Sequence, residues 1–162
     1  MEHTSSNPLA NVIGQGILCG AAGVLGMLVS QEIEKRVFGR TPSRVAAETA
    51  DKVLGMKPSS QASQGKFNVI IELTYGSALG VVRSTLGHFG ITGLGASALH
   101  LAVIGTNVSV IVPALGLVPP VREWNRQKLA IEIIHHTAYV LVTGLVYDCV
   151  MENGGRKRED GK

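Results

Sequence analysis

Long uncharged runs divide the chain, and their lengths predict helices that cross a membrane. Residues 9–31 contain no Asp, Glu, Lys or Arg, and residues 89–121 form a second run of this kind. About 20 apolar residues in a helix cross the hydrocarbon core of a bilayer. Residues 67–89 and 129–151 are also apolar, although each contains ionisable side chains. The pattern predicts an all-α integral membrane protein with four transmembrane helices.

Polar segments separate the predicted spans. Thr41 followed by Pro42 has the signature of a helix start, and apolar residues recur on one face of the next segment. We therefore expect a short interfacial helix over residues 42–54. In the third span Pro113 is expected to kink or end the helix, and residues 122–128 form the connector to the fourth span.

The second and fourth spans share one pattern of polar and small residues. The equivalent residues are Glu72, Tyr75 and Gly80 in the second span and His136, Tyr139 and Gly144 in the fourth. The pattern predicts two two-helix repeats, over residues 9–89 and 90–151. Because each repeat has an even number of spans, the two repeats point the same way, related by an axis along the membrane normal.

Composition supports a membrane protein and excludes several soluble classes. Of 162 residues, 45% are apolar and 17% are charged, and 20 are glycine, which membrane helices tolerate well. The net charge of +3 is too small for nucleic-acid binding. Cys19 and Cys149 have neither disulfide nor metal spacing. We expect one membrane domain between an N-terminal tail at 1–8 and a disordered charged tail at 152–162.

Basic residues concentrate in the connectors that follow the first and third spans, which contain ten Lys and Arg. This bias favours a cytoplasmic location for those connectors, with both termini outside. Four basic residues in the C-terminal tail favour the opposite orientation. Trp124, beside basic residues, is expected to anchor its connector in the interface.

Several glycines have the spacing of close helix packing. The candidates are Gly16, Gly20, Gly76, Gly80 and Gly144. A Gly-x-x-x-Gly spacing such as Gly16 to Gly20 forms a groove in which another membrane helix approaches closely. Two interpretations remain open: these glycines pack the chain's own bundle, or they form the face of a homo-oligomer.

Ionisable residues inside the spans are candidates for function, because charge at membrane depth is costly. Glu72 and His136 occupy equivalent positions, so we expect them at similar depth, where a Glu–His pair could share a proton. The alternatives are a buried hydrogen bond that fixes helix packing and a Glu72 side chain that reaches the headgroups. The remaining members of this candidate proton or ion site are His135, Tyr75, Tyr139 and His100.

Arg83 and Asp148 lie at corresponding ends of the second and fourth spans, which run in the same direction. The sequence therefore predicts an intramembrane ion pair, with either a structural role or a role as a gate in an ion pathway. Two histidines on different helices can ligate haem iron. His100, however, lies roughly 20 Å from its span end and His136 about 10 Å from its own. We expect no cofactor, no metal site and no catalytic constellation.

Three motifs together resemble the YagU-like family of uncharacterised bacterial inner-membrane proteins. They are Tyr75-Gly76 in the second span, Pro-Ala-Leu-Gly-Leu-x-Pro-Pro over residues 113–120, and His136-x-x-Tyr139 in the fourth span. The resemblance covers roughly residues 14–150 and implies a four-span inner-membrane protein linked to acid tolerance. That family has His where this chain has Glu72, so a matched His pair does not carry over.

The sequence predicts a small membrane protein of structural or accessory type, alone in the bilayer, as a homo-oligomer or within a larger membrane complex. The alternative is a proton-responsive channel or transporter that uses Glu72 and His136. An electron carrier with a bound cofactor is a third hypothesis, which visible absorbance of the purified protein would test.

Overall fold

A computed structural model describes residues 7–39, 45–57, 60 and 63–159, and helices account for nearly all of this part of the chain. The helices are α1 (Pro8–Phe38), α2 (Val45–Leu54), α3 (Gln64–His88), α4 (Gly93–Thr106), the π-helical turn η2 (Asn107–Ile111), α5 (Val112–Ala114), the short 3₁₀ turn η3 (Val121–Glu123) and α6 (Arg126–Glu159). Four of the helical stretches are long and apolar enough to cross a membrane: α1, α3, the run from α4 through α5, and α6. This confirms the predicted helical class and the four candidate spans.

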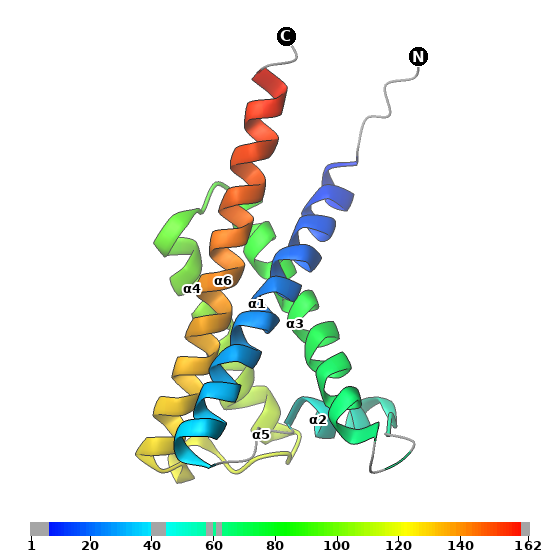
Figure 1. Cartoon of the computed structure of the whole chain (residues 1–162), viewed down its shortest axis with the longest axis vertical. Helices are drawn as coiled ribbons and strands as arrows, with labels where there is room; N and C mark the ends of the chain where they lie inside the picture. The colour runs from blue at the N-terminus through cyan, green and yellow to red at the C-terminus, as the bar shows by residue number, and fades with distance from the viewer. Residues whose placement is uncertain (1–6, 40–44, 58–59, 61–62, 160–162) are drawn as a thin grey trace.

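The four long helices form one bundle with both chain ends on the same side (Figure 1). Helix α1 packs against α3 and α6, and α4 packs against the same two helices. Helices α1 and α4 descend in the view of Figure 1, whereas α3 and α6 ascend. The turn between α3 and α4 therefore lies on the side of the chain ends, and the longer connectors lie on the opposite side.

Apolar side chains cover the outside of the bundle as well as its interior. Leu18, Leu94 and Leu145 are 66%, 82% and 66% exposed. The central buried cluster is small and is centred on Val24 and Ile104, with two residues of α6. A water-soluble bundle would bury such leucines, so this distribution is the one expected of helices that face lipid.

Helix α1 continues past the predicted end of the first span at residue 31. Glu32 lies 2.9 Å from Arg36 and 3.6 Å from Lys35, and such i,i+4 and i,i+3 pairs support a helix. The helix is capped by Gly39, which has a φ of 64° and donates its N–H to the Lys35 carbonyl at 2.9 Å. Charge therefore ends the apolar run, but the helix itself ends seven residues later, at Phe38.

The third span is interrupted where Pro113 was expected to act. A π-helical turn at residues 107–111 precedes it, with the Val112 N–H bonded to the Asn107 carbonyl, and the helix ends at Ala114. A proline removes one helical N–H and displaces the preceding turn, which accounts for the irregularity.

Both tails and the short second helix differ from the predicted boundaries or lie partly outside the described residues. Residues 152–159 continue α6, where a disordered tail was predicted, although the run contains Gly154 and Gly155, which are poor helix formers. The predicted helix start at residues 41–42 lies outside the described residues, as do residues 1–6, and α2 is described from Val45. Helix α2 packs against α3.

Candidate functional site

Glycines allow α1 and α3 to meet at backbone contact. A Cβ atom on Gly20 would lie 2.5 Å from the Gly76 carbonyl oxygen, and one on Gly16 would lie 2.5 Å from the Cα of Val81. A Cβ on Gly80 would overlap the carbonyl oxygen of Gly16. The glycine groove of the first span is therefore filled by the chain's own α3, which leaves it unavailable to a second copy in this packing.

Gly144, on α6, is close to α4 rather than to α1. A Cβ there would lie 3.1 Å from the Ser97 hydroxyl oxygen, a tight but less severe contact. All five glycines singled out in the sequence thus face a neighbouring helix of the same bundle, since Gly76 faces Val24 of α1.

A polar cluster joins α1 to α6 near the connector end of the bundle. The Nδ1 atom of His135 lies 2.8 Å from the Ser30 hydroxyl, and its Nε2 lies 2.8 Å from a carboxylate oxygen of Glu34. The His135 and Glu34 side chains are 9% and 13% exposed. Ser30 and Glu34 are one turn apart on α1 and therefore approach the same imidazole from one helix face.

In the Ser30–His135–Glu34 cluster each ring nitrogen of His135 has a partner of suitable hydrogen-bonding character. Ionised Glu34 only accepts, so Nε2 donates to it. The Ser30 hydroxyl can donate to a bare Nδ1 or accept from a protonated one. Both ring nitrogens of His135 are therefore hydrogen-bonded to α1.

Polar contacts also cross the middle of the bundle. The Tyr139 hydroxyl donates to the Gly76 carbonyl at 2.7 Å, and the His100 Nε2 donates to the Leu79 carbonyl at 3.1 Å. The ring of His100 is fully buried and meets the Tyr139 ring edge-on, with centroids 5.6 Å apart. Both side chains thereby tie α4 and α6 to α3. The tyrosine at the equivalent position, Tyr75, is 41% exposed and donates to the Asn107 side chain in the π-helical turn.

Arg83 and Asp148 form a pair near the end of the bundle that carries the chain ends. The Arg83 Nη2 lies 2.5 Å from a carboxylate oxygen of Asp148, and the guanidinium carbon lies 4.4 Å from the Tyr147 ring centroid. The Arg83 side chain is 0% exposed and that of Asp148 is 47% exposed. The two residues expected to pair from their sequence positions are thus brought together, across α3 and α6.

Glu72 and His136 have no contact with each other among the described interactions. His136 donates from Nδ1 to the Glu132 carbonyl one turn earlier, at 2.8 Å. One carboxylate oxygen of Glu72 is buried without a hydrogen-bond partner. Successive helix residues are rotated by about 100°, so when His135 faces α1, His136 is turned toward α4. The expected Glu72–His136 pair is therefore replaced by a pair that uses the neighbouring histidine and Glu34.

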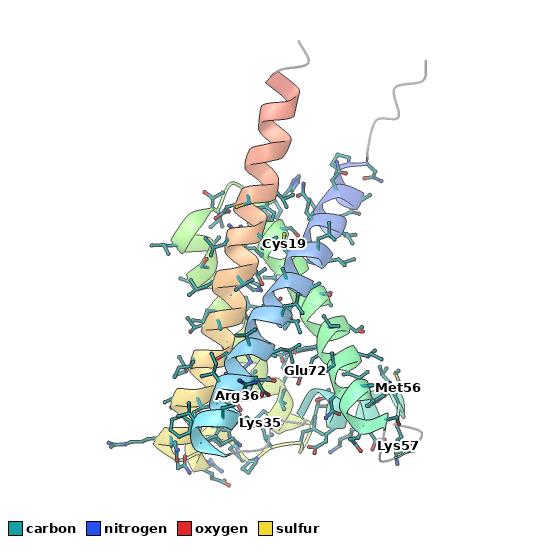
Figure 2. All side chains as sticks on the ribbon, viewed as in Figure 1. Cys19, Lys35, Arg36, Met56, Lys57 and Glu72 are labelled. Carbon is teal, nitrogen blue, oxygen red and sulfur yellow. The ribbon has the colours of Figure 1, made fainter. Side chains whose placement is uncertain are left out.

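Figure 2 shows the level of Glu72 along the bundle relative to residues of α1. Cys19 lies in the upper part of α1, Lys35 and Arg36 lie at its lower end, and Glu72 lies between these levels, on α3. Among the described residues, no group of three or more His, Cys, Asp or Glu could hold a metal ion.

Ser30, His135 and Glu34 combine the residue types of an acyl-transfer triad. Such a triad also needs N–H donors beside the nucleophile to hold an oxyanion. Ser30 lies inside α1, where backbone N–H groups already donate to carbonyls one turn earlier. The cluster is therefore better suited to joining helices than to acyl transfer.

Ser30 and Glu34 were not predicted as site residues, because Ser30 is an uncharged residue within the first apolar run and Glu34 lies beyond the predicted end of that run at Gln31. Their spacing of four residues was the available signal, because it places both side chains on one face of a helix. The i,i+4 pair of Glu32 and Arg36 indicates that the helix continues through Glu34. This spacing does not show which face of α6 packs against Ser30 and Glu34.

The helices and the site together define the class: an all-helical protein, in its described residues, with four helices able to cross a membrane. No family model matches the chain, and no curated protein or solved structure matches it either. The YagU-like resemblance thus remains a prediction from three short motifs.

Proposed function

We propose that this is a small integral membrane protein of structural or accessory type, in a bacterial inner membrane, whose intramembrane polar groups serve to join its helices. One observation carries the proposal: polar side chains at three levels of the bundle are each bonded to a helix other than their own. These are His135 to α1, Tyr139 and His100 to α3, and Arg83 to α6.

Charged and polar side chains at membrane depth are costly unless they find partners. In a transport site such groups would line a hydrated path and would exchange partners during each cycle. Here His100 and Arg83 are fully buried and held against α3 and α6. Residues held in this way favour a fixed bundle, which suits an accessory protein.

The arrangement of helices also supports the two-repeat proposal. Under a two-fold axis along the membrane normal, α1 exchanges with α4 and α3 exchanges with α6. The contacts of α1 with α3 and α6 then correspond to those of α4 with α6 and α3, and all four contacts are present. We further propose that α2, which has apolar and charged faces and packs against α3, lies in the membrane interface.

A proton-responsive channel or transporter is the second candidate, favoured by Glu72. Its buried, unpartnered carboxylate oxygen is a site at which a proton could bind without breaking a described contact. The resemblance to a family linked to acid tolerance agrees with this candidate.

Proton flux in liposomes tests the two candidates. An accessory protein predicts that liposomes with wild type, with Glu72→Gln and without protein respond equally to a pH jump. Flux that is present in wild type and lost in Glu72→Gln, with both proteins folded and equally incorporated, would contradict the proposal and support the channel. As a matched control, Glu48→Gln changes an exposed carboxylate on α2.

A further inference from the structure

A small cavity lies between the π-helical turn and the start of α6. Its volume is about 160 Å³, and its walls are mostly apolar. The lining includes Leu101, Gly105 and Ser109 from the third span, Trp124 from the connector, and Glu132 and His136 from α6. A cavity of roughly 150 Å³ is large enough for one benzene ring. Turns of π-helix, such as the one in its wall, are frequent at functional sites.

The side-chain hydrogen-bond donors of this cavity are already in use. The indole N–H of Trp124 donates to the Pro119 carbonyl at 2.8 Å, and the Ser109 hydroxyl donates to the Gly105 carbonyl. His136 donates from Nδ1 to the Glu132 carbonyl at 2.8 Å. A carbonyl only accepts, so Nδ1 carries a hydrogen and Nε2 of the neutral ring keeps its lone pair.

The other side-chain polar atoms of these lining residues are acceptors. They are the Nε2 lone pair of His136, the Ser109 oxygen and the Glu132 carboxylate, whose nearer oxygen is 3.9 Å from the His136 Nδ1. Glu132 and Trp124 both line the cavity, and carboxylates and aromatic ring faces each bind ammonium groups. At the rim the ring of Trp124 already holds one, the Lys128 Nζ, at 4.3 Å from the ring centroid.

We propose that this cavity binds a protonated amine with an apolar body of about one ring. The ammonium group would donate to Glu132 and to the His136 Nε2, while the apolar body packs against Leu101 and the Trp124 ring. The assignment goes beyond an accessory role, because it gives the protein a ligand. The same ammonium could be offered by a free amine or by a lipid with an ethanolamine headgroup.

The test uses the single tryptophan of the chain, Trp124, as a fluorescent reporter at the cavity. The full-length protein in phosphatidylcholine nanodiscs is titrated with phenethylamine and with 2-phenylethanol, which has nearly the same size but no charge. A charge-assisted hydrogen bond predicts that the amine binds at least about tenfold more tightly than the alcohol. Glu132→Gln, nearly the same shape, should abolish that difference.

Two glycines of α4 provide a matched steric pair. A Cβ on Gly105 or on Gly95 meets no atom within 4 Å, so both positions accept a side chain, but Gly105 alone lines the cavity. Gly105→Leu should remove saturable binding of both compounds, and Gly95→Leu should leave it unchanged. Lys128→Gln should tighten amine binding severalfold, because it removes a competing cation; weaker binding would indicate an anion site and overturn the assignment.

Equal affinity for amine and alcohol, selectivity that survives Glu132→Gln, or binding that survives Gly105→Leu would each refute the proposal. Nanodiscs that contain phosphatidylethanolamine show whether the bound ammonium group belongs to a free amine or to a lipid headgroup. Competition by this lipid would assign the site to an ethanolamine headgroup, and undiminished binding of phenethylamine would assign it to a free amine.

Discussion

Removing either partner of the Arg83–Asp148 pair should have unequal consequences, because the two are unequally buried. Asp148→Asn leaves the Arg83 guanidinium charged and fully buried, with its Nε and Nη1 atoms already lacking hydrogen-bond partners. Arg83→Met leaves only a carboxylate that is 47% exposed. The first variant should therefore be the more damaging one.

Leaving one charge of a fully buried pair without its partner costs about 3–5 kcal/mol. Asp148 is half exposed and Asn can still accept one hydrogen bond, so we expect about 2–3 kcal/mol for Asp148→Asn. In Arg83→Met the thioether can keep the contact with the Tyr147 ring, and no buried charge remains, so we expect about 1 kcal/mol. The double variant should resemble Arg83→Met alone.

The assay is unfolding in mixed dodecyl maltoside and SDS micelles, followed by far-ultraviolet circular dichroism, with the four proteins compared as a double-mutant cycle. Equal losses for the two single variants, or losses that add in the double variant, would refute the reasoning. Such a result would mean that Arg83 is solvated or paired in another way.

Three further predictions concern packing, and the same unfolding assay tests them. Gly80→Val should destabilise the protein by more than about 3 kcal/mol, because the valine side chain would overlap the α1 backbone. Gly14→Val, at a position with open space around it, should cost little, and equal effects of the two variants would contradict the close contact. Tyr139→Phe should lose about 1–2 kcal/mol and Tyr75→Phe less, since the former hydroxyl bond is buried and the latter exposed; the reverse order would contradict this. His100→Phe keeps the ring contact with Tyr139 but loses the bond to the Leu79 carbonyl, so we expect a loss of about 1 kcal/mol. An unchanged stability would contradict a role for His100 in joining α4 to α3.

The four spans could be predicted because lipid selects for uninterrupted apolar runs, and such runs are visible without any alignment. The helix ends could not be predicted in the same way. α1 continues past residue 31 on charged residues that pair with each other, and α6 continues to Glu159. Apolar length reports what can lie in the membrane, whereas helix length depends also on local pairs and caps.

The Arg83–Asp148 contact was predictable because both residues lie at the same end of parallel spans, and charges of opposite sign at one depth have few other partners. The Ser30–His135–Glu34 cluster was not predictable in this way. It depends on which face α6 turns toward α1, and a difference of one residue rotates a side chain by about 100°.

The matching residues of the second and fourth spans illustrate the same limit. Tyr75 and Tyr139 have the same place in the pattern, yet Tyr139 is 3% exposed and bonded to α3, while Tyr75 is 41% exposed and bonded to the π-helical turn. Equivalent positions fix the depth of a side chain along its helix. Its partner depends on the neighbouring helix, and α1 and α4 present different residues to α6. The expectation that Glu72 pairs with His136 used depth alone, without the direction of each side chain around its helix. In the structure the preceding histidine, His135, is the one that contacts a carboxylate, that of Glu34.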